Sequence, residues 1–312
     1  MKTLWITGAR GFIGRHLARQ LAASGHRVAG VGHGAWPTLE ATEWGVKYWF
    51  NGDVSGSNLA QMHAMLGSPA GIFHFAGGSS VGAALANPRE DFMRTVGSTA
   101  ELLEWVRQYS PATPLVAVSS AAVYGGGQDG LIDEGAKLVP YSPYGTHKLM
   151  MEELCRSYAV NFGLLIAVPR LFSVFGPELK KQLLWDMCNK LAAQDRIELG
   201  GSGGELRDWT HVGDVVSVLE RLIGIANMSA HSLNVATGQK VSVRDVAAAL
   251  AQAWDSNSPP AIHFNGNSRP GDPYSLCADV TQLRALGFAC DKPWRAGIAE
   301  YVAWFRSLKG RI

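Results

Sequence analysis

The segment TGARGFIG, residues 7–14, has three glycines directly after the apolar run LWIT and at the start of a helical pattern that extends to residue 24. Gly8, Gly11 and Gly14 allow the backbone to turn tightly, to approach a pyrophosphate closely and to pack a helix on a sheet. Free N–H groups at the start of that helix face a bound anion. A strand, a glycine loop and a helix in this order predict a dinucleotide site, and the alternative is a glycine-rich turn without a ligand.

Strand and helix patterns alternate outward from this loop up to about residue 172. The apolar runs VAGV, GIFHFAG, PLVAVSS and LLIAVPRLF predict strands, and helical periodicity occupies 88–109 and 145–162. Repeated alternation of this kind is typical of an α/β fold with a doubly wound parallel sheet, a Rossmann domain. We therefore assign residues 1–172 to a dinucleotide-binding Rossmann domain.

Beyond residue 173 the pattern changes to separated helices joined by loops rich in glycine and proline, such as GGSGGELRDW and NSRPGDP. This change predicts a smaller, mostly helical C-terminal substrate-binding lobe over 173–312, which covers the carboxyl edge of the sheet. The boundary is soft, because later segments could rejoin the sheet. The predicted helices of this lobe are 178–194, 212–226, 242–254 and 295–307.

Composition excludes several classes of protein. The chain has 28 Lys and Arg against 26 Asp and Glu, so a formal charge of +2 provides no basic surface for nucleic acid or a membrane. Its four cysteines form no CxxC and its nine histidines show no metal-ligand spacing, which favours a cytoplasmic protein with reduced thiols and no metal site. The apolar runs are too short for a membrane span, and the N-terminus begins with a strand pattern rather than a signal peptide.

The end of the second predicted strand, VAGVGHG, bears on the cofactor. The position that normally carries an acid for the ribose 2′-hydroxyl holds Gly32, followed by His33. A carboxylate would repel a 2′-phosphate, so its absence, together with Arg10 in the glycine loop, favours NADP, with NAD possible. The alternative for Arg10 is a solvated side chain. Asp53, in NGDV after the third strand, is placed to accept a hydrogen bond from an adenine amino group or simply to cap the strand.

The segment SPYGTHK, residues 142–148, places Tyr144 and Lys148 four positions apart at the start of a predicted helix. Residues with this spacing share one helix face. A tyrosine with an ordinary pKa near 10 becomes a base near neutrality only after a drop of roughly 2 to 3 units, and one ammonium about 4 Å away supplies an energy of that order. We therefore expect Lys148 to lower the pKa of Tyr144; an ordinary helix face is the alternative.

The strand VAVSSAAVYG, residues 116–125, ends in hydroxyl groups at the sheet edge where ligands bind in such folds. Ser120 is placed to hydrogen-bond a substrate oxygen and to help orient the proton that Tyr144 exchanges. Taken alone it is an ordinary strand-end serine. The glycine loop, Ser120 and the tyrosine–lysine pair together form a more specific pattern than any one of them.

These motifs resemble those of the extended short-chain dehydrogenases/reductases that act as nucleotide-sugar epimerases, dehydratases and reductases. TGARGFIG is similar to the family's TGxxGxxG, HFAG to its fourth-strand motif, SSAAVYG to its serine motif and SPYGTHK to its YxxxK. The resemblance extends over nearly the whole chain. It implies that Tyr144 is the acid–base catalyst, that Lys148 anchors a ribose and lowers the tyrosine pKa, and that Ser120 orients the substrate.

The resemblance also assigns binding residues. PRLFSVFGP, ELRDWTHVGD and RPGDP are similar to substrate-lobe signatures, and two arginines in them are implied to hold the nucleotide diphosphate through their planar guanidinium groups. A surface ion pair is the alternative for each. The substrate-binding residues expected are Ser79, Ser120, Ser173, Arg207 and Arg269. The cofactor-binding residues expected are Gly8, Arg10, Gly11, Phe12, Ile13, Gly14, His33, Asp53, Val54, Ala76 and Lys148.

Departures from the family pattern bear on the reaction. Dehydratases of the family carry two proton-exchanging side chains just after the catalytic hydroxyl, and Ala121 and Ala122 occupy those places, which argues against 4,6-dehydration. An NDP-4-keto-6-deoxyhexose reductase that consumes NADPH, or a 4-epimerase that keeps NAD bound, then remains. The absence of an acid at Gly32 slightly favours the reductase. Ser173 and Thr95 replace asparagines, and Leu171 replaces a residue that is often aromatic, so an ordinary UDP-galactose epimerase is less favoured.

A third hypothesis is a non-catalytic dinucleotide sensor, which the intact Ser120, Tyr144 and Lys148 argue against. Members of the family usually pair through helices that correspond to 88–109 and 145–162. A homodimer is therefore expected.

Overall fold

The computed structural model describes residues 2–126, 130–194, 196–267 and 273–309. The chain divides into two compact units rather than at a single point near residue 172, because the segment after residue 215 contributes a strand to the sheet of the first unit. Unit 1 comprises Met1–Gly125, Glu134–Leu171 and Val216–Val235, and unit 2 comprises Gly126–Asp133, Phe172–Val215 and Ala236–Ile312.

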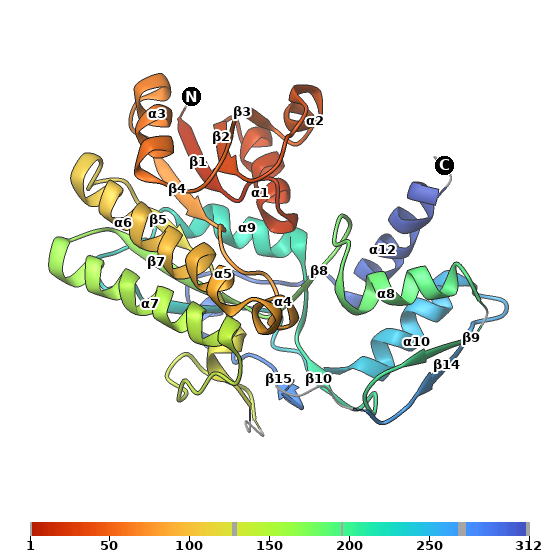
Figure 1. The fold of residues 1–312 in the computed structure, drawn as a ribbon. Helices are drawn as coiled ribbons and strands as arrows, with labels where there is room; N and C mark the ends of the chain where they lie inside the picture. The colour runs from red at the N-terminus through yellow and green to blue at the C-terminus, as the bar shows by residue number, and fades with distance from the viewer. Residues whose placement is uncertain (1, 127–129, 195, 268–272, 310–312) are drawn as a thin grey trace. The chain divides into compact units, whose positions relative to one another are not determined.

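Unit 1 is built on a parallel sheet, as predicted (Figure 1). The strand order is β12-β7-β5-β4-β1-β2-β3, and β6 also pairs with β7. The sequence left open whether later segments rejoin the sheet; β12 does so, since its residues pair with β7. The strands are β1 (Thr3–Thr7), β2 (Arg27–Gly32), β3 (Val46–Asn51), β4 (Gly71–His74), β5 (Leu115–Ala117), β6 (Ser119–Ser120), β7 (Ile166–Leu171) and β12 (Ser232–Val235).

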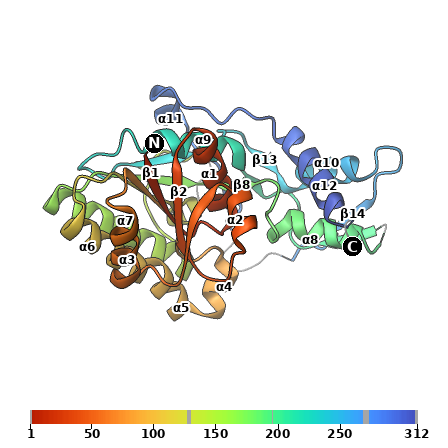
Figure 2. The same ribbon diagram turned by 90° about the horizontal axis from the view of Figure 1, so that it is seen from above.

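Helices cover both faces of this sheet (Figures 1 and 2). On one face α3 (Gly56–Leu66), α6 (Ser98–Tyr109) and α7 (Pro143–Phe162) lie side by side. On the other, α1 (Phe12–Ala23) lies beside α9 (Val212–Leu222), where Gln20 donates a hydrogen bond to Glu220. Aliphatic and aromatic side chains fill the space between the sheet and the first group of helices; they include Trp5, Leu59, Ile72, Leu102, Trp105, Leu115 and Met151.

The predicted helix 88–109 is three helical segments in succession. These are α5 (Pro88–Phe92), a π-helical segment η1 (Met93–Gly97) and α6. Asn87 caps α5 by accepting the Glu90 N–H, and Pro88 occupies the first turn. A π segment inserts one extra residue per turn and is often found at functional sites. It brings Thr95 into the interior of unit 1. Two short helices of unit 1 were not predicted, α2 (Thr38–Glu43) and α4 (Val81–Ala86).

Unit 2 is mostly helical, with short strand pairs. Trp185, Trp254, Trp304 and Phe305 pack their rings together between its helices, with ring centroids 5.2 to 6.1 Å apart. Its helices are α8 (Gln182–Leu191), α10 (Val243–Trp254), α11 (Thr281–Ala285) and α12 (Trp294–Lys309). Its strands are β8 (Ser173–Phe175), β9 (Arg196–Leu199), β10 (Leu206–Arg207), β11 (Trp209–His211), β13 (Val241–Ser242), β14 (Ala261–Phe264) and β15 (Ser275–Leu276).

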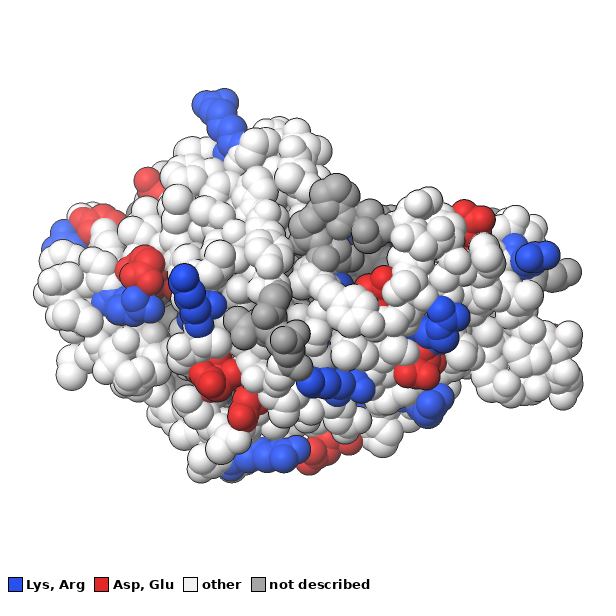
Figure 3. All heavy atoms as spheres, turned by 90° about the horizontal axis from the view of Figure 1, so that it is seen from below, with Lys and Arg blue, Asp and Glu red and all other residues white. Residues whose placement is uncertain are grey.

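Charge is distributed in small groups. On the face drawn in Figure 3, basic and acidic side chains are interspersed among uncharged ones. Within the described part of the chain, every helix is too short or too polar to span a bilayer. The four cysteines are free and buried.

Candidate functional site

The glycine loop joins β1 to α1 with little space around its backbone. Gly8 has φ +73°, and its N–H donates to the Val31 carbonyl at 2.7 Å. A Cβ atom at Gly14 would stand 2.5 Å from the Gly8 oxygen, and one at Gly11 would stand 3.1 Å from the same atom. Gly11 caps α1 without a side-chain hydrogen bond, and the first turn carries no acid. The open N-terminus of a 12-residue helix beside a loop that excludes side chains fits a pyrophosphate.

The positions at and just after the end of β2 are crowded. A Cβ at Gly32 would lie 3.1 Å from the Trp49 ring, and a Cβ at Gly34 would overlap the Arg10 guanidinium. Arg10 therefore lies directly over the segment that follows β2. Beside it, His33 Nε2 and Asp53 Oδ1 are 3.0 Å apart, and both side chains are exposed. The structure thus groups three of the residues expected to hold the cofactor.

Tyr144 lies in the first turn of α7, close to the end of β6. Ser142 caps this helix by accepting the Gly145 N–H at 3.2 Å, and Pro143 occupies its first position. A Cβ at Gly145 would stand 2.5 Å from the Ala122 carbonyl oxygen, so glycine permits α7 to approach the 3-10 turn η2 (Ala121–Tyr124). This approach brings the Tyr144 phenol close enough to the Ser120 hydroxyl for that hydroxyl to lower its pKa.

The protonation of Tyr144 differs from the prediction. Burial raises the pKa of its phenol, the Ser120 hydrogen bond lowers it, and the Asp91 carboxylate raises it further. The expected lowering by Lys148 is therefore wrong in this structure. The Lys148 ammonium instead donates to the Val118 carbonyl oxygen at 2.9 Å.

Lys148 is a buried amine, 4% exposed. Burial lowers its pKa to about 8, against the influence of the Asp91 and Glu152 carboxylates, which raise it. A Cβ at Gly77, in the loop after β4, would lie 3.4 Å from Nζ, so this backbone passes directly over the amine. Lys148 thus lies between the end of β5 and the loop after β4, within reach of a ribose bound there.

A directed chain of hydrogen bonds connects the glycine loop to η1. The Ala76 N–H donates to Thr7 Oγ1 at 3.1 Å, which leaves the Thr7 hydroxyl proton for His74 Nδ1 at 2.7 Å. The Thr99 hydroxyl donates to the Thr95 carbonyl at 2.6 Å, and so accepts from His74 Nε2 at 3.0 Å. His74 is therefore neutral with its proton on Nε2, and burial lowers its pKa to about 3. The chain holds β1, β4 and η1 in one arrangement.

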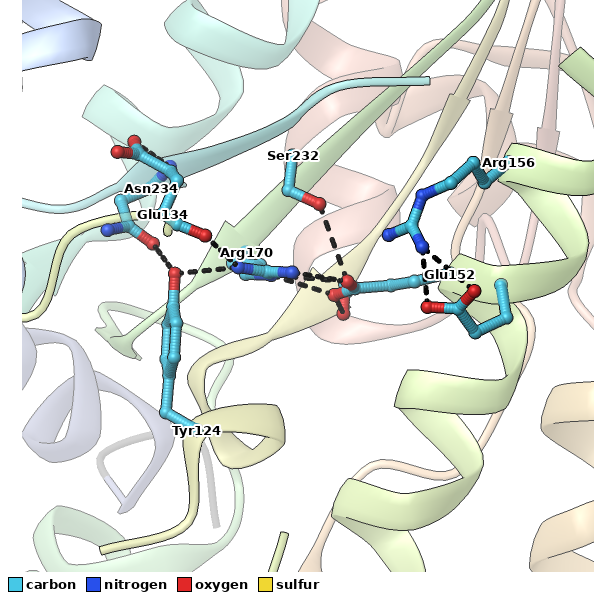
Figure 4. Close-up of polar contacts among 9 residues, drawn as sticks. Tyr124, Glu134, Glu152, Arg156, Arg170, Ser232 and Asn234 are labelled. Carbon is cyan, nitrogen blue, oxygen red and sulfur yellow. Dashed lines mark hydrogen bonds and ion pairs between the residues drawn. The ribbon is translucent and has the colours of Figure 1, made fainter. Parts of the chain in front are cut away.

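A buried ion pair lies one turn beyond Lys148 along α7 (Figure 4). Glu152 Oε2 is 2.6 Å from an Arg170 terminal nitrogen, and Arg170 Nε donates to Oε1 at 3.0 Å. Both residues are almost completely buried. The Ser119 hydroxyl donates to Glu152 Oε1 at 2.5 Å. Tyr144, Lys148 and Glu152 are spaced by four residues, so one face of α7 carries all three.

On the other side of Arg170, the guanidinium N–H groups donate hydrogen bonds to neutral acceptors. It donates to the Tyr124 hydroxyl at 2.9 Å, and that hydroxyl donates to Asn234 Oδ1 at 2.7 Å. Arg170 also donates to the Glu134 carbonyl at 3.1 Å, while the Glu134 carboxylate accepts the Asn234 N–H. Figure 4 shows the Arg170 guanidinium, from β7, between Glu152 and Tyr124, with Glu134 beside it and Asn234 of β12 against the Tyr124 hydroxyl. The network joins the strand that ends in Ser120 to the helix that carries Tyr144.

The residues expected to bind the substrate are divided between the two units. Ser79 is in unit 1, in the loop after β4, whereas Ser173 and Arg207 are in unit 2. Ser173 donates its N–H to the Asp208 carbonyl at 3.0 Å. Arg207 donates to the Leu206 and Tyr274 carbonyls. Arg269 lies outside the described residues.

Asp208 organises the strands around Arg207 in unit 2. Its buried carboxylate accepts hydrogen bonds from the Thr210 and Thr237 hydroxyls and from the backbone N–H groups of Thr237, Gly238 and Ala278. Three segments distant in sequence are held by this one side chain. A carboxylate that accepts so many hydrogen bonds is satisfied where it is and takes a structural role.

Sequence reasoning missed the buried charged residues around the site. Glu152 continues the four-residue spacing of Tyr144 and Lys148, and Arg170 interrupts an otherwise apolar strand. Both features are visible in the sequence as charges in buried patterns. Asp91 and His147, which form a buried pair 2.6 Å apart, carry no comparable signal.

A protein-family model matches this chain over residues 4–236; its description is the NAD dependent epimerase/dehydratase family. An uncharacterized UDP-glucose epimerase of Bacillus subtilis, YtcB, is 29% identical over 99% of both chains. A UDP-glucose 4-epimerase of Mycolicibacterium smegmatis is 29% identical over 98% of this chain and 99% of its own. Among solved structures, MoeE5 in complex with UDP-glucuronic acid and NAD is 31% identical, with a TM-score of 0.86, over 98% of this chain and 99% of its own.

Proposed function

Because the chain belongs to the NAD dependent epimerase/dehydratase family, we propose that it is a nucleotide-sugar 4-epimerase that retains NAD. The observation that carries the proposal is the placement of Tyr144 in the first turn of α7 beside Ser120 at the end of β6, with Lys148 one turn away and the glycine loop at the same sheet edge. Relatives named as UDP-glucose epimerases, similar over nearly the whole length, support this reaction over a keto-sugar reductase.

Residues of unit 1 fit the cofactor. Gly8, Gly11 and Gly14 leave space for a pyrophosphate at the start of α1, and Asp53 is available for the adenine end. The remaining expected cofactor residues, Phe12, Ile13, Val54 and Ala76, flank these positions in sequence. NAD, when bound, takes up the hydride of the sugar carbon and later returns it.

Tyr144 moves the proton of the sugar C4 hydroxyl. Its oxygen accepts this proton when the carbon loses hydride, and donates it back when the carbonyl is reduced on its other face. The Ser120 hydroxyl, which lies close to Tyr144, orients the sugar oxygen toward the phenol. Lys148, whose buried ammonium lies within reach of a ribose at this sheet edge, would hold the cofactor beside Tyr144. The proton and the hydride are both returned, so the reaction needs no outside reductant.

The substrate proposed is a nucleoside diphosphate sugar. MoeE5 binds UDP-glucuronic acid, and a UDP-sugar is therefore the first substrate to test. Arg207, Arg269, Ser173 and Ser79 remain the residues proposed to bind it. Guanidinium groups suit diphosphate oxygens because they donate two parallel hydrogen bonds.

The test is to incubate the purified protein with UDP-glucose, UDP-galactose, UDP-glucuronic acid and their N-acetylated counterparts, without added cofactor. We expect one pair of C4 epimers to interconvert, with NAD released on denaturation and products identified by NMR. Tyr144→Phe protein serves as the control for contaminating activity. Consumption of NADPH in equal amount with a 4-keto sugar would instead identify a reductase, and binding without turnover would identify a sensor.

A 4-keto reductase that uses NADPH is the second candidate, because glycine occupies position 32, where an acid would repel a 2′-phosphate, and the Arg10 guanidinium lies beside Gly34. The test is the affinity of Arg10→Ala protein for NADP and NAD, measured by calorimetry. A loss of roughly tenfold for NADP alone would support a 2′-phosphate contact. Arg19→Ala, which removes a positive charge on α1, the helix that follows the glycine loop, is the matched control. Equal losses for both cofactors would remove Arg10 from that role.

A further inference from the structure

Asp91 and His147 form a buried hydrogen-bonded pair that the proposed reaction does not yet use. Asp91 Oδ2 lies 2.6 Å from His147 Nδ1, and the residues are 5% and 9% exposed. Asp91 is near the end of α5, and His147 follows Tyr144 by three positions on α7. The His147 ring also packs edge-on against Phe92, with centroids 5.5 Å apart. The pair therefore fixes the first turn of α7, which carries Tyr144, against α5.

The Asp91 carboxylate is pressed against the loop after β4. A Cβ atom at Gly78 would overlap Asp91 Oδ1, so the acid occupies the space that a side chain there would take. The Gly78 N–H donates to Thr95 Oγ1 at 2.8 Å, which holds the loop in this position. This carboxylate is close enough to raise the pKa of both Tyr144 and Lys148.

Few other charges face the pair. Helix α4 packs against α7 and has no ionisable side chain, and the loop 76–80 has none either. Segment η1 contributes Arg94, which forms an exposed ion pair with Glu90 of α5. On α7 the nearest titratable groups are Tyr144 and Lys148 themselves, and Glu152 is engaged by Arg170.

The net charge of the Asp91–His147 pair affects proton transfer by Tyr144. To act as a base the phenol must first lose its own proton and become an anion, and a bare carboxylate beside it opposes that change. A protonated imidazole hydrogen-bonded to the carboxylate makes the pair neutral as a whole. The charge that Tyr144 experiences therefore depends on the partner that His147 provides.

We propose that Asp91 and His147 are a positioning pair for Tyr144, in which the proton held by His147 compensates the Asp91 charge beside the reactive phenol. This inference deepens the proposed function and rests on Tyr144 as its proton-transfer group. It makes His147 and Asp91 determinants of the pH range in which the enzyme works, although neither exchanges a proton with the substrate.

The test is a spectrophotometric titration of Tyr144. Phenolate absorbance is recorded against pH for each protein and for the same protein with Tyr144→Phe, so the difference reports this phenol alone. In His147→Gln protein the uncompensated carboxylate should raise the pKa of Tyr144 by about 1 unit. In Asp91→Asn/His147→Gln protein, where both charges are gone, the pKa should return to within about 0.3 unit of wild type. The acidic limb of the kcat profile should move by the same amounts.

Glu90→Gln is the matched control, because this carboxylate neighbours Asp91 in sequence but is exposed and paired with Arg94. It should leave the Tyr144 titration unchanged. Should His147→Gln protein fail to fold, Asp91→Asn protein tests the same charge and should lower the pKa of Tyr144. An unchanged Tyr144 titration in folded His147→Gln protein, with only a lower Tm, would show that the pair is purely structural.

The titration needs no substrate, so its outcome is separate from that of the proposed reaction. A shifted titration without epimerase turnover would support the positioning role of Asp91 and His147 and would contradict the proposed 4-epimerase reaction. Epimerase turnover with an unshifted titration would keep the reaction and reject the pair.

Discussion

Tyr144 is the residue on which the proposed chemistry depends, because it lies beside the strand-end Ser120 and one helical turn before the buried Lys148. Replacement of Tyr144 by Phe removes only the hydroxyl. We expect kcat to fall by roughly 10²- to 10⁴-fold, with cofactor affinity within about twofold of wild type. Initial rates and cofactor titration measure the two effects. Tyr158→Phe, on the same helix but bonded to Glu104, is the control and should retain full activity. A Tyr144→Phe protein that turns over normally would exclude the phenol from the mechanism.

His74 makes the stability of the protein depend on pH. Its pKa is about 3 in the folded protein and 6.5 ordinarily, so the unfolded chain binds more protons between these values. Stability should therefore fall as the pH decreases below 6.5, by about 2 kcal/mol between pH 6.5 and 5. Urea unfolding across this range measures the slope.

His74→Gln protein should be less stable at pH 7, yet lose most of that slope. The exposed His231 provides the control, since His231→Gln should leave the slope as in wild type. A slope that survives in His74→Gln protein would show that other groups cause the acid sensitivity.

At the level of single residues, the sequence predicted what local spacing encodes. Tyr144 and Lys148 are four positions apart, and Ser120 ends a strand, so their proximity follows from helix and sheet geometry. Asp91 and His147 lie on different helices, and only the packing of α5 on α7 brings them together. That packing determines the charge near Tyr144. For this reason the direction in which the pKa of Tyr144 is shifted could not be predicted from Lys148 alone.

Among the elements, helix α7 and strand β7 are joined by the Glu152–Arg170 pair. Removing one partner of a buried ion pair leaves an uncompensated charge, whereas removing both does not. Glu152→Leu should therefore destabilise the protein by about 3–5 kcal/mol, and Glu152→Leu/Arg170→Met by less. Chemical denaturation measures both values.

The exposed pair of Glu153 and Arg156 on the same helix, also drawn in Figure 4, is the control. Glu153→Gln should cost less than about 1 kcal/mol. If the double variant is destabilised as much as Glu152→Leu, then packing rather than charge accounts for the loss.

The predicted elements agree with the structure where periodicity is strong, as in α1, α7 and α10. The helix expected over 88–109 contains the π segment, which hydrophobic spacing cannot reveal because a single inserted residue changes the register only locally. Short strands such as β8, β10 and β13 were also not predicted. Strands of two or three residues have too few positions to show alternation, and they form because their partners are in place.

At the scale of the whole molecule, the parallel sheet was predicted, while its last strand was not. Strand β12 follows the first helices and strands of unit 2 in the sequence, and its pairing with β7 depends on contacts that no local pattern records. The same holds for Glu134, which joins unit 1 through Arg170 and Asn234. Long-range pairing therefore sets the division into units.

The association state is the prediction that belongs to this scale. Exposed apolar side chains on α6 and α7, Tyr109, Met150, Val160 and Phe162, are available for a homodimer through these helices. We expect a dimer at micromolar concentration by sedimentation, and a monomer after Val160→Glu. Leu39→Glu, at an equally exposed apolar position on α2, is the control and should remain dimeric. A wild-type monomer at this concentration would contradict the expectation.

Because β12 comes late in the sequence, it also affects how the chain folds during its synthesis on the ribosome. Strand β7 ends at Leu171, but its outer neighbour begins only at Ser232. Until that segment has emerged, the nascent protein exposes an unpaired strand edge, and the Tyr124 hydroxyl lacks its Asn234 acceptor. Ribosome stalling or truncation between these two points should therefore yield aggregation-prone chains that depend on chaperones.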